Sequence, residues 1–229
     1  MGAIADAVQA CQNRIVLACA EAGRPRDGVR LLAVSKTFPA AAVREAHAAG
    51  LTAFGESYLQ EARDKQDALS DLALEWHFIG PLQGNKTRLV AERFAWVHAL
   101  EREKIAWRLS EQRPVSLPPL NVCVQINVSA EPGKHGLPLE RGLELARLVA
   151  SLPGLSLRGF MTIPEASLQF AHTRFARLRD LLERARAEGL PVDTLSMGMS
   201  ADLEVAILEG ATLVRIGSAI FGARPLPNN

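Results

Sequence analysis

The stretch Val29-Arg30-Leu31-Leu32-Ala33-Val34-Ser35-Lys36-Thr37 decides how the fold of this chain is interpreted. Leu31 to Val34 form an uninterrupted apolar run that leads into a lysine, and a Thr-Phe-Pro break and a helical pattern follow. An apolar run of this length predicts a strand buried on both faces, as in a parallel sheet. The carboxyl end of such a strand is where an α/β barrel carries its chemistry. We therefore expect Lys36 at the mouth of a barrel.

Eight candidate strands alternate with helical stretches along the chain. Turn-forming pairs such as Gly80-Pro81 and Pro153-Gly154 separate them. Alternating units predict a parallel sheet, and eight of them predict closure into a (β/α)₈ barrel. An open doubly wound sheet, which needs only about six strands, is the alternative. The expected strands span residues 30–34, 52–55, 75–79, 95–99, 121–128, 156–161, 194–197 and 212–216, and the expected helices span residues 40–49, 57–70, 85–92, 102–112, 138–150, 167–188 and 201–209, with a short turn at 218–221.

A leading helix is expected ahead of the barrel. Ile4, Val8, Cys11 and Ile15 recur at helical spacing, which predicts a helix over residues 4–22, before a barrel over residues 30–224. No repeat, low-complexity tract or linker divides the chain, and 229 residues suit one α/β unit. We expect a single domain over residues 1–229.

The composition excludes several classes of function. The net charge is +1 with both signs interspersed, which argues against nucleic-acid binding and against a polybasic membrane patch. No segment reaches the ~20 apolar residues of a membrane span, and the N-terminus lacks a basic signal-peptide region, so a cytoplasmic protein is expected. Three cysteines without C-x-x-C spacing indicate reduced thiols, and the scattered histidines indicate no metal site.

Lys36 is a candidate nucleophile. An ammonium group is rarely buried without a partner, and a site of low dielectric lowers the pKa of an amine, which frees it to attack a carbonyl. The alternative is a lysine whose stem lies along the strand end while its charge reaches water.

Two glycine-containing loops are candidate phosphate sites. Ser196 to Asp202 follow the seventh expected strand, with Ser200 as the expected cap of the next helix, and Arg215 to Ala219 follow the eighth. Barrels often bind phosphate with the loops after strands seven and eight, through free backbone N–H groups. Ordinary capped turns are the alternative.

A closed barrel brings strand eight next to strand one, so a ligand that spans both Lys36 and the phosphate loops carries a carbonyl and a phosphate. Pyridoxal 5′-phosphate meets that description, and a sugar-phosphate aldolase is the rival interpretation.

Seven ordered motifs resemble the pyridoxal phosphate homeostasis protein family over residues 5 to 224. The motifs are Leu32-Ala33-Val34-Ser35-Lys36-Thr37, Phe54-Gly55-Glu56, Trp76-His77-Phe78-Ile79-Gly80-Pro81-Leu82-Gln83 with Asn85-Lys86, Gln125-Ile126-Asn127-Val128, Arg158-Gly159-Phe160-Met161, Met197-Gly198-Met199-Ser200 and Arg215-Ile216-Gly217-Ser218-Ala219-Ile220-Phe221-Gly222. The resemblance implies the barrel of the alanine racemase N-terminal domain, which is fold type III among pyridoxal phosphate proteins, without the second, β-rich domain. Ser57 and Gly84 replace an asparagine and a serine of the family pattern, and Ser218 replaces a threonine.

The resemblance also implies roles for single residues. Lys36 carries pyridoxal phosphate covalently as a Schiff base, and Arg215 faces the pyridine nitrogen. An arginine there weakens the ring as an electron sink, since a guanidinium donates only. From its position at the end of the third expected strand, and not from the resemblance, His77 is either a general base or a hydrogen-bonded barrel histidine, and no aspartate is placed to orient it. The expected cofactor-binding residues are Lys36, Ser57, His77, Met161, Ser200, Arg215, Gly217 and Ser218.

The function that the resemblance implies is that of a carrier. The chain is expected to hold and buffer pyridoxal phosphate in vitamin B6 and amino-acid homeostasis, as a monomer, without robust catalysis, with apo-enzymes as possible recipients of the cofactor. The alternative is a small racemase or lyase that uses the same cofactor. Racemisation needs a second acid or base opposite the lysine, and the single tyrosine, Tyr58, is poorly placed for it.

Overall fold

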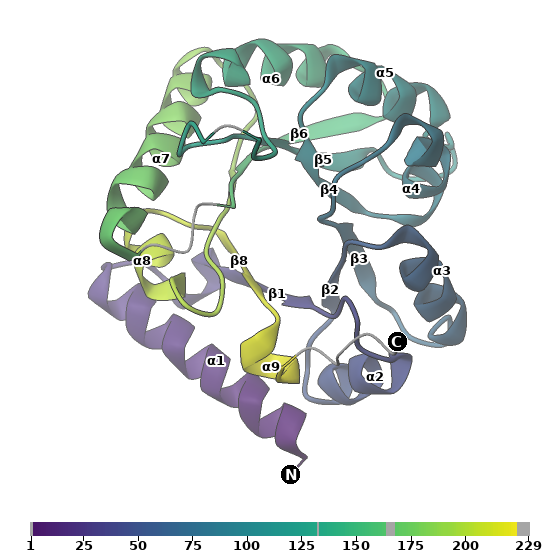
Figure 1. Ribbon diagram of the computed structural model, residues 1–229, viewed down its shortest axis with the longest axis vertical. Helices are drawn as coiled ribbons and strands as arrows, with labels where there is room; N and C mark the ends of the chain where they lie inside the picture. Colours follow the sequence, from purple (N-terminus) through teal and green to yellow (C-terminus); the bar gives the residue numbers. More distant parts are fainter. Residues whose placement is uncertain (1, 132, 164–167, 224–229) are drawn as a thin grey trace.

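Eight parallel strands close into one barrel in sequence order in the computed structural model, which describes residues 2–131, 133–163 and 168–223 (Figure 1). The first and last strands are neighbours, with Leu32 opposite Arg215 and Ala33 opposite Ile216. The expected closed barrel is therefore confirmed. The strands are β1 (Arg30–Val34), β2 (Ala53–Glu56), β3 (Glu75–Phe78), β4 (Trp96–Leu100), β5 (Leu120–Gln125), β6 (Leu155–Met161), β7 (Thr194–Ser196) and β8 (Leu213–Ile216).

Helices surround the barrel, and the leading helix α1 (Ala3–Glu21) lies across its outside against α2, α8 and α9 (Figure 1). Val8, Cys11 and Ile15 form the buried face of α1, as the helical spacing predicts. The other helices are α2 (Ala40–Ala48), α3 (Leu59–Ala68), α4 (Thr87–Arg93), α5 (Glu103–Gln112), α6 (Gly142–Ser151), α7 (Ala171–Ala187), α8 (Leu203–Leu208) and α9 (Ser218–Phe221), with 3₁₀ turns at Arg26–Gly28, Gly84–Lys86, Leu139–Arg141 and Leu168–Phe170.

The barrel has an apolar outer layer and a partly polar interior. Side chains alternate along each strand, so on β3 Trp76 and Phe78 pack toward the helices. His77 points the other way and is fully buried. The interior also holds His98 and Arg215, together with a small apolar cluster of Trp96, Ala99, Cys123 and Met161. This polar interior lies beneath the mouth formed by the strand ends.

A few expected boundaries differ from the structure. β5 ends at Gln125 because Ile126 forms an isolated bridge with Leu137 instead of continuing the ladder. Five helices begin at least two residues later than expected: α3 at Leu59, α4 at Thr87, α6 at Gly142, α7 at Ala171 and α8 at Leu203. A 3₁₀ turn precedes α4, α6 and α7. Residue 167, the expected start of α7, and residue 224, the expected end of the barrel, lie outside the described residues.

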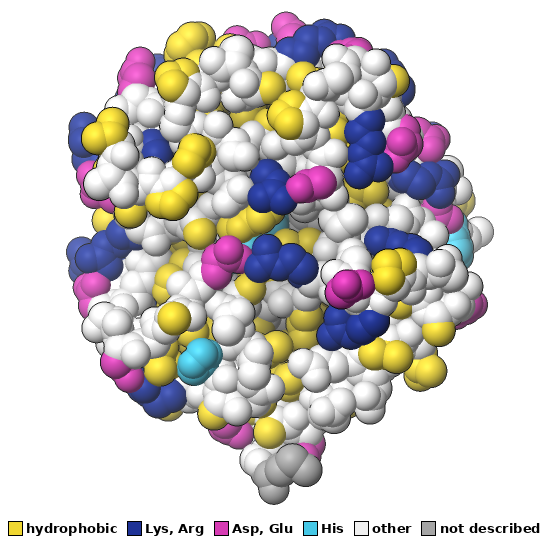
Figure 2. All heavy atoms as spheres, turned by 180° about the vertical axis from the view of Figure 1, so that it is seen from behind, with side chains coloured by type: hydrophobic (Ala, Val, Ile, Leu, Met, Phe, Trp, Pro, Cys, Tyr) yellow, Lys and Arg dark blue, Asp and Glu magenta, His cyan; other side chains and the backbone are white. Residues whose placement is uncertain are grey.

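Charges of both signs are mixed on the surface. On the face in Figure 2, basic and acidic side chains lie next to one another around the middle instead of forming separate patches. No helix within the described residues is long and apolar enough to cross a membrane. The three cysteines, Cys11, Cys19 and Cys123, are buried free thiols, as expected.

Candidate functional site

A pocket of ≈ 390 Å³ opens at the carboxyl ends of β1 and β8. Its volume lies within the usual range for sites that bind small molecules. Lys36 and Arg215 are its only ionisable lining residues within the described parts of the chain. The lining residues are Val34, Lys36, Phe38, Ser57, Ile79, Ile163, Met199, Ser200, Ala201, Arg215, Gly217, Ser218 and Gly222.

The residue before Lys36 is bonded to a buried ion pair. Lys65, on α3, donates from Nζ to the carbonyl oxygen of Ser35 at 2.6 Å and to Oε1 of Glu56 at 2.7 Å. The Ser35 hydroxyl donates to the same carboxylate oxygen at 2.6 Å. Lys65 and Glu56 are 5% and 0% exposed, so each charge depends on the other for compensation. The pair fixes the backbone at the entry to Lys36.

Thr37, the residue after Lys36, is linked to Lys65 through a second carboxylate, that of Glu61. Glu61 Oε1 accepts from Lys65 Nζ at 2.6 Å and from the backbone N–H of Thr37 at 2.6 Å. Thr37 has φ 71°, a left-handed conformation that a β-branched residue rarely adopts. The Lys65 cluster, which comprises Lys65, Glu56 and Glu61, therefore holds both neighbours of Lys36.

Burial shapes the electrostatics of the Lys65 cluster. Burial raises the pKa of the Glu56 carboxyl, and the Lys65 ammonium opposes that shift. Glu56 Oε2 is buried without a hydrogen-bond partner among the described residues, while Oε1 accepts from both Ser35 and Lys65. Loss of Lys65 would leave an uncompensated buried carboxylate, which is among the costliest single changes in a fold.

The loops after β7 and β8 meet through two serines. The Ser218 hydroxyl donates to Ser200 Oγ at 3.2 Å, and the backbone N–H of Ala219 donates to the same oxygen at 3.4 Å. The expectation that Ser200 caps the next helix was wrong, because α8 begins at Leu203 and Asp202 precedes it. Asp202 instead accepts from the backbone N–H of Met199 at 2.6 Å. Ser200 is therefore directed to the pocket side of the loop, next to Ser218.

Close packing explains two glycines of these loops. Gly198 has φ 95°, and a Cβ there would lie 2.6 Å from Cβ of Ala206, so only glycine fits without a shift. A Cβ on Gly217 would lie 3.3 Å from the carbonyl oxygen of Val34, in β1. Gly217 thus lets the loop after β8 lie close to the strand that carries Lys36.

Arg215 lies beneath the pocket with its guanidinium fixed by neutral acceptors. Nη1 donates to the carbonyl oxygen and the hydroxyl of Ser196 at 2.6 and 2.8 Å, and Nη2 donates to the carbonyl oxygen of Thr162 at 2.8 Å. Burial lowers the pKa of Arg215 to about 10, and the Asp202 carboxylate opposes that shift. Arg215 therefore remains charged at neutral pH.

The structure brings together six of the eight expected residues. Lys36, Ser57, Ser200, Arg215, Gly217 and Ser218 line the pocket. His77 and Met161 do not line it: Met161 belongs to the apolar cluster inside the barrel, and His77 hydrogen-bonds Glu75 and His98. The sequence analysis considered only an aspartate as the group that could orient His77. In the structure Glu75, two residues earlier on the same face of β3, has its Oε1 2.7 Å from His77 Nε2. Tyr58 is 54% exposed, at the start of α3.

The contacts of two groups of residues near the pocket were not predicted from the sequence. Lys65 and Glu61 lie in the polar segment LQEARDKQDA, where nothing in the spacing distinguishes a buried lysine from a solvated one. His98 and Ser196 lie on β4 and β7 and meet only because the barrel closes. The sequence does indicate one contact: Glu75 and His77 are two residues apart on a strand, so their side chains lie on the same face.

Comparison with known proteins gives matches over nearly the whole chain. The model of a family described as "Alanine racemase, N-terminal domain" matches residues 8–225. The pyridoxal phosphate homeostasis protein of Pseudomonas aeruginosa is 60% identical over 226 residues, 98% of this chain and 97% of that one. The protein of the same name from Escherichia coli is 49% identical over 229 residues, 98% of each chain. The solved structure of PipY from Synechococcus elongatus with PLP bound has a TM-score of 0.80 at 36% identity and covers 92% of this chain and 99% of that one.

The fold and the pocket define a barrel of the alanine racemase N-terminal type. The chain belongs to the pyridoxal phosphate homeostasis protein family, as the ordered motifs indicate.

Proposed function

We propose that this protein binds pyridoxal phosphate as a Schiff base on Lys36 and serves as a carrier and buffer of the cofactor in the cytosol. The observation that supports this most strongly is the placement of one lysine and two serine-bearing loops around one pocket, at the junction of β1 and β8. The name of the relatives and the PLP bound to PipY agree with it.

The residues present fit the proposed cofactor. Pyridoxal phosphate supplies an aldehyde that condenses with an amine and a ring that withdraws electrons. Ser200 and Ser218 present adjacent hydroxyls, and Gly217 has no side chain to block an anion from the backbone of the β8 loop. We assign the phosphate to these three residues and the aldehyde to Lys36.

Arg215 supplies donors for the ring. Its hydrogen bonds to Ser196 and Thr162 use three guanidinium N–H groups, so within the described residues the second N–H of Nη2 and the N–H of Nε have no partner. We assign a contact with the pyridine nitrogen to this side chain. A guanidinium with a pKa of about 10 donates at neutral pH and does not protonate the ring, which limits the ring as an electron sink.

The carrier role is favoured over catalysis by the pocket lining. Apart from Lys36 and Arg215, no described lining residue is ionisable, so none offers a second acid or base opposite the lysine. A racemase or lyase that uses the same cofactor is the second candidate, favoured by the family description. Delivery of the cofactor to apo-enzymes and a monomeric state remain part of the proposal.

A comparison of three ligands tests the proposed binding mode. Pyridoxal phosphate, pyridoxal and inorganic phosphate are titrated separately against the protein, with absorbance for the first two and competition for the third. We expect tight binding of pyridoxal phosphate, much weaker binding of pyridoxal, and displacement of the cofactor by inorganic phosphate at high concentration. Equal affinity for pyridoxal and pyridoxal phosphate would refute the assignment of Ser200, Gly217 and Ser218 to a phosphate.

A further inference from the structure

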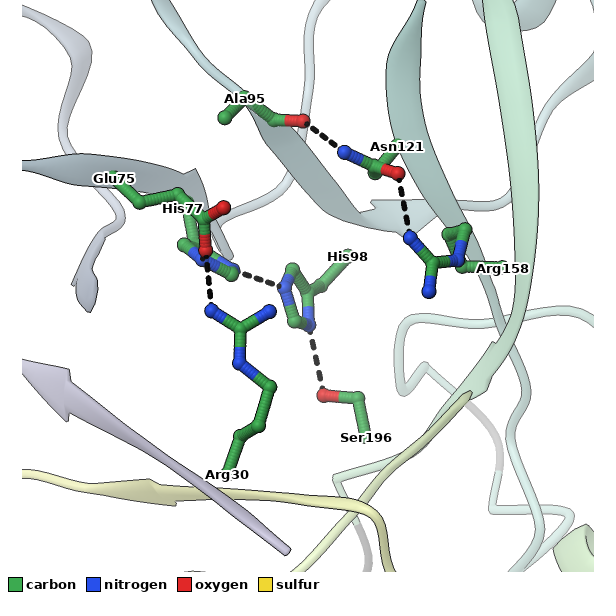
Figure 3. A network of polar contacts seen from close by, with 8 residues as sticks. All are labelled: Arg30, Glu75, His77, Ala95, His98, Asn121, Arg158 and Ser196. Atoms are coloured by element: carbon green, nitrogen blue, oxygen red, sulfur yellow. Dashed lines mark hydrogen bonds and ion pairs between the residues drawn. The ribbon is translucent and has the colours of Figure 1, made fainter. Parts of the chain in front are cut away.

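A chain of hydrogen bonds crosses the inside of the barrel from Arg215, beneath the pocket, to Glu75 at the opposite end. Figure 3 shows the members from Ser196 to Glu75. Arg215 Nη1 lies 2.8 Å from Ser196 Oγ, which lies 2.8 Å from His98 Nδ1. His98 Nε2 lies 2.9 Å from His77 Nδ1, and His77 Nε2 lies 2.7 Å from Glu75 Oε1. Glu75 is the first residue of β3, whereas the pocket opens at the carboxyl ends of the strands. The chain therefore joins the two ends of the barrel.

The direction of the protons along this chain follows from its first member. A guanidinium has no acceptor, so Arg215 donates to Ser196 Oγ. A hydroxyl has one hydrogen, and Ser196 uses it toward His98 Nδ1. His98 then carries its proton on Nε2 and donates to His77 Nδ1. His77 likewise carries its proton on Nε2 and donates to the carboxylate of Glu75. In every bond of the chain the donor is therefore the partner nearer to Arg215, and the acceptor is the partner nearer to Glu75.

The charges around the two histidines agree with this arrangement. Burial lowers the pKa of His98 well below its usual value, and Arg215, His77 and Arg30 add to that shift. Burial also lowers the pKa of His77, although Glu75 opposes it. Both rings are therefore neutral at pH 7, each with one donor and one acceptor. The reverse arrangement needs a protonated His77 and leaves the Ser196 hydrogen without an acceptor in the chain.

The far end of the chain is anchored at the opposite mouth of the barrel. Glu75 Oε1 also accepts from Arg30 Nη2 at 2.6 Å, and the bond from His77 holds the pKa of Glu75 down at about 2. The His77 ring stacks on Trp96, with centroids 5.3 Å apart and planes 7° from parallel. These contacts leave His77 little freedom to rotate. The carboxylate is thus a fixed acceptor.

We propose that Glu75, His77, His98 and Ser196 form a relay that positions Arg215 toward the cofactor ring from the opposite end of the barrel. The proposal rests on the binding of pyridoxal phosphate inferred above. Among the described residues Arg215 makes no hydrogen bond to a carboxylate, although Asp202 acts on it through space. The relay connects Nη1 of Arg215 to the distant carboxylate of Glu75. The remaining N–H groups of Arg215 can then donate to a ligand in the pocket. The four residues are positioning residues and do not touch the ligand.

The protonation of the two rings is a direct test that needs no ligand. In protein labelled with ¹⁵N-histidine, long-range ¹H–¹⁵N correlation spectra identify which nitrogen of each ring carries the proton. Spectra of His77→Gln and His98→Gln assign the two buried rings among the five histidines. We expect both rings to be neutral at pH 7 with the proton on Nε2. A proton on Nδ1 of either ring, or an imidazolium, would overturn the relay.

Two variants test whether the relay acts on the ligand. Ser196→Ala removes the hydroxyl between Arg215 and His98, and Glu75→Gln removes the charge while it keeps the shape of the side chain. We expect each to weaken pyridoxal phosphate by about tenfold, the loss of about one charge-assisted hydrogen bond, and to shift the absorbance maximum of the bound cofactor. Inorganic phosphate is assigned to Ser200 and Ser218, so we expect the affinity of each variant for it to lie within about twofold of that of the wild type.

A control variant and the remaining outcomes distinguish failure of the relay from failure of the proposed cofactor binding. Glu188→Gln breaks an exposed pair with Arg147 and should leave both affinities unchanged. An unchanged affinity for pyridoxal phosphate in the relay variants, or an equal loss for both ligands, would show that the four residues serve stability alone. If the wild type failed to bind pyridoxal phosphate, the proposed function would fail, and the ring protonation would still decide whether the relay exists.

Discussion

Lys65 Nζ lies 2.6 Å from the carbonyl oxygen of Ser35, the residue that precedes the proposed cofactor lysine. The same ammonium bonds Glu56 and Glu61, so a helix, two strand ends and the Lys36 turn share one buried cation. The bond exists because the polar α3 turns this one lysine inward, where it is 5% exposed. Lys65 thereby couples the stability of the fold to the position of Lys36.

Replacement of Lys65 should therefore be costly. Lys65→Met leaves the Glu56 carboxylate buried and unpaired, and we expect a loss of about 3–5 kcal/mol in the free energy of unfolding. Urea denaturation monitored by circular dichroism measures it, with Lys104→Met, at an exposed position of α5, as the matched control. The double variant Glu56→Gln/Lys65→Met removes both charges and should recover much of the stability. A loss below about 1 kcal/mol, the range of surface pairs, would contradict the role given to Lys65.

The recovered double variant also separates stability from positioning. Without Lys65 the carbonyl oxygen of Ser35 and the Glu61 carboxylate lose their common donor, so the turn around Lys36 is less restricted. We expect the double variant to form the pyridoxal phosphate adduct more slowly than the wild type, as measured by stopped-flow absorbance. Equal rates would show that the Lys65 cluster contributes to the fold alone.

The two serines should contribute to affinity individually. Ser200→Ala and Ser218→Ala each remove one hydroxyl from the proposed phosphate site, and we expect each to weaken pyridoxal phosphate by about 1–3 kcal/mol. Ser151→Ala, an exposed serine whose hydroxyl bonds its own helix, is the control. Equilibrium titration measures the affinities, and thermal melts should match the wild type. Unchanged affinity in both variants would place the phosphate elsewhere.

The buried histidines predict a specific dependence of stability on pH. Burial lowers the pKa of His77 and of His98, so the folded protein keeps both rings neutral while the unfolded chain protonates them below about pH 6.5. The unfolded state then binds more protons, and stability falls as the pH drops, by up to about 1.4 kcal/mol per pH unit for each ring. Urea unfolding between about pH 7.5 and 5 measures the slope. His98→Gln should reduce it relative to the wild type. An unchanged slope in His98→Gln would argue against a neutral buried His98.

Catalysis by the bound cofactor is expected to be weak. The described pocket lining holds no second acid or base, and the proposed contact of Arg215 with the pyridine nitrogen would limit the ring as an electron sink. We predict no racemisation, transamination or decarboxylation of any amino acid above roughly 1 s⁻¹, the low end of ordinary turnover numbers. A panel of L- and D-amino acids assayed by chiral chromatography checks this. Turnover at ordinary enzyme rates on one amino acid would restore the racemase-like alternative.

Much of the fold and half of the site chemistry could be predicted from the sequence because they depend on local patterns. The apolar run Leu31 to Val34 has to be buried on both faces, and eight such runs separated by helices leave few topologies besides a closed barrel. Lys36 and the two loops followed from their places at strand ends. The motifs then identified the family.

The remainder depends on contacts between distant residues. Lys65 is buried only because α3 packs over the ends of β1 and β2, and the few apolar residues of this mostly polar helix do not reveal that Lys65 faces inward. His98 lies 98 residues from Ser196 and meets it across the barrel. Ser200 was expected as a helix cap, whereas its hydroxyl meets the neighbouring loop because α8 begins three residues later.

The central claim, that Lys36 carries the cofactor, is tested most directly by reduction of the complex with borohydride followed by peptide mass spectrometry. The account predicts a single pyridoxyl phosphate increment on the peptide that contains Lys36, loss of the visible absorbance on reduction, and neither signal in Lys36→Ala. Lys134→Ala, a change in a lysine paired with Glu131 outside the pocket, should behave as the wild type. A stoichiometric increment on any other lysine, or an undiminished adduct in Lys36→Ala, would contradict the account.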